Sequence, residues 1–119
     1  MLIGGLLSAT NVGDAPFRAR WAQSLAAFEN QVATLGPPGP GPHLRSKISG
    51  PCPARIGSFR IAECNALDRG YLFVQAQDAV TDVSGILYVP DGRRPASTGL
   101  DSSGFTALGG PWWAWTCYC

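Results

Sequence analysis

The chain has 119 residues, of which 45% are hydrophobic and 14% are charged, and nine basic and eight acidic side chains give a net charge of +1. This length suits one domain with one hydrophobic core. The basic side chains are spread along the chain, which excludes both the basic patch of a nucleic-acid-binding protein and a polybasic membrane-surface segment. Because about 25% of an average globular chain is charged, this surface is either neutral and polar or apolar where it meets a partner.

Residues 1–13 form an apolar N-terminal segment, in which 2–9 carry no charged side chain. A membrane-spanning helix needs about 20 apolar residues, so the segment is too short to cross a membrane alone. It also lacks the basic start of a signal peptide. Two interpretations stay open. The segment is either a frayed end or short strand, or it is the end of a truncated membrane anchor that begins upstream.

Residues 14–35 are predicted to form an amphipathic helix. Asp14 suits the N-cap and Pro16 suits the first turn. Apolar side chains recur at steps of three and four residues, at Phe17, Trp21, Leu25, Phe28, Val32 and Leu35. The dipeptide 36–37, Gly-Pro, ends the helix. A stripe with three aromatic residues favours packing on a sheet.

Residues 36–54 are predicted to be a linker, because six prolines and four glycines fall in this stretch. Such a composition is typical of extended, semi-rigid chain. A docking peptide for a proline-recognition domain is the alternative. The one histidine, His43, also lies here, where a solvated loop residue is expected rather than a rigidly placed general base.

In residues 55–119 apolar and polar side chains alternate with a period of two residues, which predicts β-strands. The predicted strands are 56–63 with Phe59 and Ile61 on one face, 71–77, 86–89, 105–108 and 112–119. Turn residues separate them. The sequence therefore predicts a single α+β domain, with one N-terminal amphipathic helix packed on an antiparallel sheet of four to five strands.

Groups that could perform catalysis are sparse. Asp78 and Asp82 flank one turn and could approach as an acid/base pair, although aspartates in such places are typical of turns. The stretch 109–111, Gly-Gly-Pro, lacks the lysine and the following helix of a phosphate-binding loop. A single histidine disfavours Ser/His/Asp and Cys/His triads. We therefore predict neither an enzyme nor a cofactor.

The four cysteines, Cys52, Cys64, Cys117 and Cys119, allow three interpretations. They form one or two disulfides, which would imply an oxidising compartment. They bind zinc as a four-thiolate site, although the chain has one C-x-C and no C-x2-C spacing. They stay free and behave as small buried hydrophobic residues.

The C-terminal strand carries aromatic residues on both faces. Trp113 and Trp115 are predicted to lie in the core with the aromatic residues of the helix. Trp112 and Tyr118 point the other way and are predicted to be partly exposed. Because exposed aromatic side chains favour contact with partners, these two are the candidate binding patch. On this interpretation Trp112→Ala would leave folding intact.

Three stretches, 53–61, 85–92 and 109–115 (the last reading Gly-Gly-Pro-Trp-Trp-Ala-Trp), resemble uncharacterised bacterial membrane-anchored proteins over most of the chain. Those proteins carry an N-terminal membrane segment, a helix and a small β-rich domain that ends in an aromatic strand. The resemblance implies a truncated anchor at residues 1–13 and brings no catalytic residue with it.

The sequence thus favours a small non-enzymatic interaction domain, membrane-tethered or extracytoplasmic in its full form. Its expected partner is a macromolecule, in the first place a protein, and not nucleic acid. The alternative is a small cytosolic protein that uses its cysteines for metal or redox chemistry.

Overall fold

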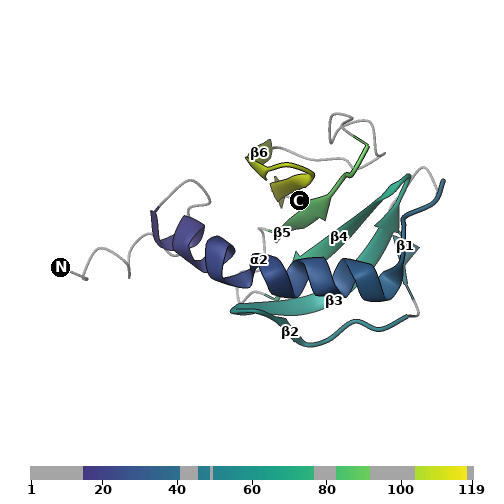
Figure 1. The fold of residues 1–119 in the computed structure, drawn as a ribbon, viewed down its shortest axis with the longest axis horizontal. Helices are drawn as coiled ribbons and strands as arrows, with labels where there is room; N and C mark the ends of the chain where they lie inside the picture. The colour runs from purple at the N-terminus through teal and green to yellow at the C-terminus, as the bar shows by residue number, and fades with distance from the viewer. Residues whose placement is uncertain (1–14, 41–45, 49, 77–82, 92–103, 118–119) are drawn as a thin grey trace.

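A computed structural model describes residues 15–40, 46–48, 50–76, 83–91 and 104–117 of the chain. Within these ranges one helix, α2 (Ala15–Leu35), accompanies a seven-stranded sheet (Figure 1). The strands are β1 (Ser46–Lys47), β2 (Arg55–Ile56), β3 (Phe59–Leu67), β4 (Gly70–Gln75), β5 (Val83–Tyr88), β6 (Gly104–Gly109) and β7 (Trp112–Cys117).

The sheet has the order β1-β3-β4-β5-β7-β6, β2 also pairs with β3, and all the pairs are antiparallel. The prediction of an α+β fold with a helix on an antiparallel sheet is confirmed. The predicted number of four to five strands is too low. Sequence reasoning missed β1 and joined β2 to β3 as the single strand 56–63, whereas the chain turns at 57–58 between them. β1 and β2 have two residues each, which is too short to produce a period of two.

The helix packs through the stripe predicted for it. Four of its six apolar residues are buried, and Leu25 and Leu35 are partly buried against the same cluster. Gly36 ends the helix with φ of 88°, and its N–H donates to the Val32 carbonyl at 2.8 Å. This left-handed glycine is the usual stop signal of a helix. The predicted N-cap, Asp14, lies outside the described residues.

Strand β3 runs four residues beyond its predicted end at residue 63. The hairpin turn contains only Asp68 and Arg69, with Leu67 paired to Gly70 across it. Arg69 adopts a φ of 57°, a left-handed conformation that residues with a Cβ take mainly in turns. Residues 65–67, which lie between the predicted strands 56–63 and 71–77, are therefore strand and pair with 70–72 of β4. The side-chain amide of Asn65 donates to the Glu63 carboxylate at 3.0 Å.

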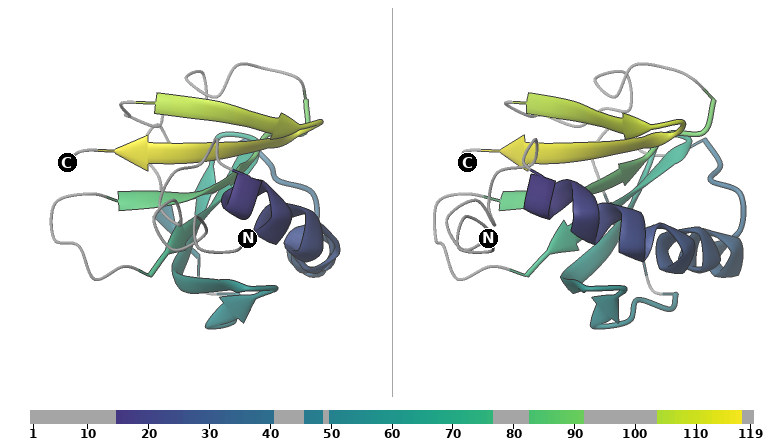
Figure 2. Two further views of the ribbon diagram at one scale, coloured as in Figure 1. Left: turned by 90° about the vertical axis from the view of Figure 1, so that its left-hand side faces the viewer. Right: turned by 60° about the vertical axis from the view of Figure 1, so that its left-hand side comes forward.

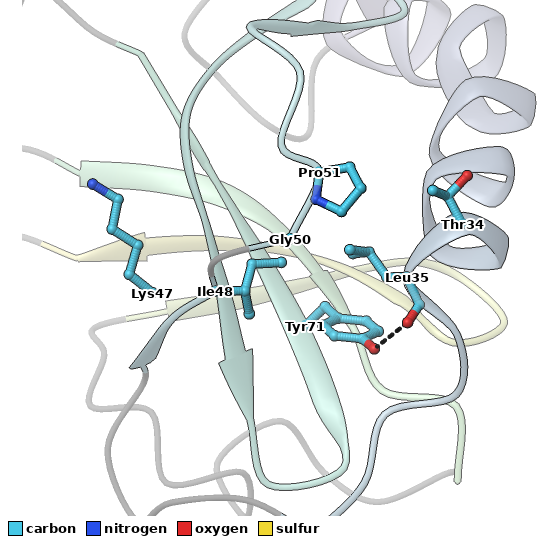
Figure 3. A pocket seen from close by; sticks show the side chains of 7 residues that line it. All are labelled: Thr34, Leu35, Lys47, Ile48, Gly50, Pro51 and Tyr71. Atoms are coloured by element: carbon cyan, nitrogen blue, oxygen red, sulfur yellow. Dashed lines mark hydrogen bonds between the residues drawn. The ribbon is translucent and has the colours of Figure 1, made fainter.

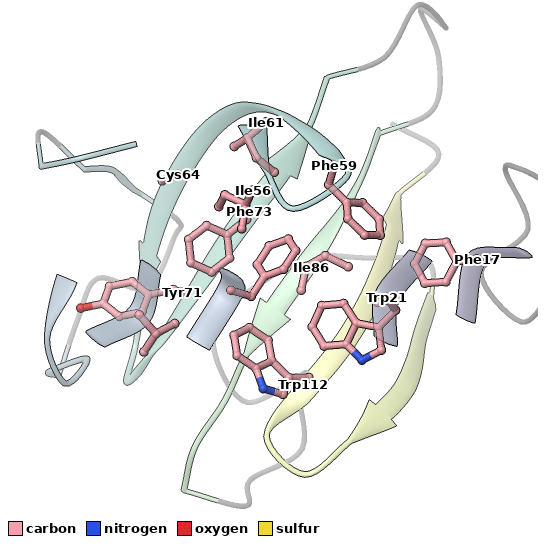
Figure 4. Packing of buried hydrophobic residues seen from close by; sticks show 13 residues of the cluster. Phe17, Trp21, Ile56, Phe59, Ile61, Cys64, Tyr71, Phe73, Ile86 and Trp112 are labelled. Atoms are coloured by element: carbon pink, nitrogen blue, oxygen red, sulfur yellow. The ribbon is translucent and has the colours of Figure 1, made fainter. Parts of the chain in front are cut away.

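The two faces of the sheet carry separate hydrophobic clusters. The helix face, which packs against α2, holds a cluster formed with the helix itself (Figure 4), made of Phe17, Trp21, Phe28, Val32, Ile56, Phe59, Ile61, Cys64, Tyr71, Phe73, Ile86, Trp112 and Ala114. The second face holds Leu67, Leu72, Val74, Leu87, Val89 and Trp115, with Val83, Phe105 and Trp113 partly buried beside them. The prediction that Phe59 and Ile61 lie on one face of their strand is confirmed, and that face meets the helix.

The orientation predicted for the C-terminal strand is wrong. Trp112 is only 4% exposed, and its ring lies 5.3 Å from that of Trp21 and 5.9 Å from that of Phe28. Trp113 and Trp115 lie on the second face instead. Since both faces of the sheet bury apolar side chains, the alternation along β7 could not decide which set meets the helix.

The described part of the predicted linker 36–54 is attached to the domain at several points. The Arg69 N–H donates to the Gly39 carbonyl (2.8 Å). Farther along, the Ile48 N–H donates to the Cys64 carbonyl (3.0 Å). This segment also contributes β1, so part of it forms the edge of the sheet beside β3.

The turn between β2 and β3 rests on the middle of α2. Ser24, which is fully buried in the helix, accepts a hydrogen bond from the Ser58 N–H at 3.0 Å. The Arg20 guanidinium lies 4.4 Å from the centre of the Phe59 ring and donates to the Ser58 carbonyl at 3.3 Å. The sheet twists so that this β2–β3 hairpin and the β6–β7 hairpin lie on either side of α2 (Figure 2).

Candidate functional site

A groove lies between the C-terminal end of α2 and the segment that leads from β1 toward β2. Its volume is about 430 Å³. It is lined by Thr34, Leu35, Lys47, Ile48, Gly50, Pro51 and Tyr71 (Figure 3). The helix, the segment after β1 and the sheet each supply part of the lining, so the groove forms only when these three parts are assembled.

Tyr71 joins the floor of the groove to the end of the helix. Its hydroxyl donates to the Gly36 carbonyl at 2.9 Å. The Leu35 carbonyl lies 3.5 Å from the same hydroxyl (Figure 3). The last carbonyls of a helix have no partner within it. Tyr71 therefore satisfies carbonyl groups at the end of α2 and fixes the helix relative to β4.

A disulfide joins Cys52, the residue after the groove residue Pro51, to Cys64 of β3, with the two Cα atoms 5.8 Å apart. Cys64 is buried in β3 while Cys52 is exposed. The neighbouring Pro51 carbonyl accepts a hydrogen bond from Gln31 Nε2 at 2.8 Å. One wall of the groove is thus bound covalently to the sheet and by a hydrogen bond to the helix.

The side chains of the groove suit binding. Of the described residues that line it, none carries a carboxylate, an imidazole or a thiol. Lys47 supplies an exposed positive charge, and the Thr34 hydroxyl already donates to the Asn30 carbonyl at 3.0 Å. Ile48 and Pro51 add apolar surface, so a neutral or acidic extended segment matches this lining.

The phenol of Tyr71 should make stability depend on pH. Burial, and secondly the charge of Tyr88, raise the pKa of Tyr71 above its ordinary value of 10.0. A group with a higher pKa in the folded chain binds its proton more tightly there. Its contribution is therefore complete below about pH 10 and is lost as the pH rises through the folded value.

We expect Tyr71→Phe to lower the free energy of unfolding by about 1 kcal/mol at neutral pH, because it removes one hydrogen bond to the helix end. We also expect the decline in stability above pH 10 to become shallower in this variant. Urea denaturation at a series of pH values measures both effects. An equally steep decline in Tyr71→Phe would show that another group causes it.

The predicted binding patch of Trp112 and Tyr118 does not form as expected. Trp112 is buried against α2, and Tyr118 lies outside the described residues. The rings of Trp112 and of Tyr88, its partner across β5 and β7, are tilted against each other with their centres 4.8 Å apart. This tryptophan is part of the core, so the exposure predicted for it is wrong.

Two of the four candidate cysteines are brought together and form the disulfide. Cys117 pairs through its backbone with Val83 at the end of β7, and Cys119 lies outside the described residues. Because the sulfurs of Cys52 and Cys64 are bonded to each other, the four-thiolate zinc site is not formed. Across the described ranges, no group of three or more His, Cys, Asp or Glu side chains is placed to hold a metal ion.

The other candidates for chemistry, His43, Asp78 and Asp82, lie outside the described residues, as does the N-terminal segment 1–13. Among the helices that the structure describes, none is long and apolar enough to cross a membrane. The stretch 109–111 forms the tight connection between β6 and β7, with positive φ at Gly109 and Gly110.

Comparison of the chain with family models, with curated proteins and with solved structures finds no match. The resemblance to membrane-anchored bacterial proteins therefore gains no support from these comparisons. Functional argument for this chain rests on its own residues.

Sequence reasoning missed the groove. Its lining comes from three stretches that are distant in the sequence and carry no shared motif. One local signal was available, because Cys52 stands between Pro51 and Pro53 in a stretch otherwise poor in apolar side chains. A cysteine in such a place has little core to join, which favours a covalent partner.

Proposed function

We propose that this chain is a small non-enzymatic interaction domain that works outside the reducing cytoplasm and binds another macromolecule, in the first place a protein. The observation that supports the proposal is the disulfide between Cys52 and Cys64. Disulfides persist in oxidising compartments and are rare in the cytosol.

The disulfide attaches a segment that has little other packing against the core. Segment 50–54 is exposed throughout and holds two prolines, so little apolar burial attaches it to the core. A disulfide across 12 residues stabilises a fold by about 3 kcal/mol through the loss of unfolded-chain entropy. Without this bond the wall of the groove would depend on hydrogen bonds alone, such as those from Gln31 to Pro51 and from the Ile61 N–H to the Ala54 carbonyl (2.9 Å).

The low charge of the chain also supports an interaction role. Charged residues make up 14% of the sequence, and the groove adds an open surface with one cation, Lys47. A membrane tether at residues 1–13 belongs to the same proposal. It would place the domain at a membrane surface on the oxidising side.

Production of the chain with and without an export signal tests the proposal. We expect the exported chain to accumulate with Cys52 and Cys64 linked, and the cytosolic chain to be less stable by about 3 kcal/mol. Cys52→Ser should reproduce that loss in the exported form, because it removes the bond at its exposed end. Denaturant titration with and without reductant measures the difference.

Asn30→Ser is a suitable control, because it changes an exposed residue of α2 and leaves the disulfide in place. It should respond to reductant as the unaltered chain does. A reduced chain as stable as the oxidised one would remove the reason to place this domain outside the cytoplasm.

A further inference from the structure

The two edges of the sheet differ in how they are protected against pairing with another chain. One edge consists of β1 and β2, which both pair with β3. The other edge is β6, the last strand in the sheet order. An edge strand presents unpaired N–H and C=O groups, and native proteins usually protect it.

The edge formed by β1 and β2 carries several protective features. Each strand has two residues and includes an exposed cation, Lys47 in β1 and Arg55 in β2. The segment between them contains prolines and is held by the disulfide at Cys52. Short strands, cations and prolines all discourage the addition of a further strand.

Strand β6 lacks these features. It is six residues long, with the sequence Gly-Phe-Thr-Ala-Leu-Gly, and contains neither a charged residue nor a proline. It pairs with β7 on one side, and no strand of the described ranges pairs with its other side. A register shift between Ala107 and Gly109 is its one irregularity, so the regular part is 104–107.

Apolar surface continues up to this edge. On the second face of the sheet, Phe105 is partly buried and Ala107 is exposed. Trp113 of β7, which pairs with Ala107 of β6, is also partly buried. A strand added beside β6 would cover part of these three side chains as well as satisfying the backbone.

We propose that β6 pairs antiparallel with β6 of a second copy of this chain and forms a twofold-symmetric dimer with one continuous sheet. This inference deepens the proposed function and rests on its claim that the chain acts by binding. An antiparallel strand pair is self-complementary about a twofold axis, so one surface serves both partners.

Among the registers that keep the same face of both copies on one side, we choose the one centred on the regular part of β6, which places Thr106 opposite Thr106 of the second copy. Phe105 then lies opposite Ala107. Cross-strand Thr–Thr pairs are favourable, and the Phe105 ring of each copy would cover the exposed Ala107 of the other. No charged side chain meets another in this register, and a net charge of +1 adds little repulsion between the copies, which favours a second copy over a charged partner.

Sedimentation equilibrium of the full, oxidised chain tests the proposal. We expect a reversible dimer of the 12.5 kDa chain at roughly 100 μM, because pairing of one short strand gives a small interface. Thr106→Lys should weaken the dimer about fivefold or more, since two ammonium groups then face each other. Thr106→Asp should do the same.

A mixture of Thr106→Lys and Thr106→Asp should regain the dimer, because the two opposite charges meet across the axis. This result would also show that both variants are folded. Ala22→Lys, at an exposed position of α2, adds the same charge elsewhere and should leave dimerisation unchanged. Hydrogen exchange of the unaltered chain should slow in β6 with rising concentration, with no change in β1 and β2.

A monomer at every concentration would overturn the dimer, as would a dimer that Thr106→Lys leaves intact. A monomer with the disulfide in place would leave the proposed function standing with a different partner. Conversely, a dimer whose cysteines are reduced in the cell would preserve the β6 pairing and remove the extracytoplasmic role.

Discussion

Replacing Trp112 by alanine should lower the free energy of unfolding by about 3–5 kcal/mol, the usual loss for a large buried aromatic side chain. Trp112 is 4% exposed and contacts the rings of Trp21, Phe28 and Tyr88. Its removal would leave a cavity between α2 and β7 that these rings could fill only in part. Guanidinium denaturation followed by circular dichroism measures the loss.

Trp113→Ala provides the matched control, because it removes the same side chain from the next position of β7. Trp113 lies on the second face and is only partly buried, so a clearly smaller loss is expected. If Trp112→Ala kept the stability of the unaltered chain and Trp113→Ala did not, the register of β7 described above would be wrong.

Gly57→Ala should lower the free energy of unfolding by about 3–4 kcal/mol. Gly57 has a φ of 58°, and a left-handed conformation costs a residue with a Cβ about 1–2 kcal/mol. A Cβ at this position would also overlap Cβ and Oγ of Ser24 and lie 2.8 Å from its Cα. Since a backbone atom cannot rotate away, the turn between β2 and β3 would have to lift from the helix.

Gly110→Ala separates the two contributions to this loss. Gly110 has nearly the same φ, 57°, but a Cβ there would meet no atom within 4 Å. We therefore expect only the conformational cost, about 1–2 kcal/mol. Equal losses in the two variants would contradict close packing of the β2–β3 turn on α2.

The helix and the long strands could be predicted because their residues repeat with a clear period. The stripe from Phe17 to Leu35 fixes the buried face of α2, and Gly36 fixes its end. Phe59 and Ile61 likewise identify the inner face of β3. In each case one face is apolar and the opposite face is not, so burial follows directly from the pattern.

Strand β7 shows where such reasoning fails. Trp112, Trp113 and Trp115 make both of its faces aromatic, so a shift of one residue would exchange the sets without leaving a polar side chain buried. Which set of tryptophans faces the helix is decided by the pairing of Tyr88 in β5 with Trp112 in β7. That pairing is a long-range contact, and no local pattern encodes it.

Of the features at the candidate site, only the disulfide was among the possibilities that the sequence offered. The sequence left open whether they form disulfides, bind zinc or stay free, and the structure joins Cys52 to Cys64. The groove beside them depends on Tyr71 reaching the end of the helix and on Pro51 accepting a bond from Gln31. Both contacts join residues 20 or more positions apart, beyond the reach of any motif.

The most direct test is an intact-mass thiol count on the chain purified from the cells that make it, alkylated under denaturing conditions with and without reductant. We predict that Cys52 and Cys64 resist alkylation until reductant is added, and that protease digestion yields one linked peptide pair containing both. Alkylation of both cysteines without reductant would contradict a disulfide-stabilised interaction domain that works outside the reducing cytoplasm.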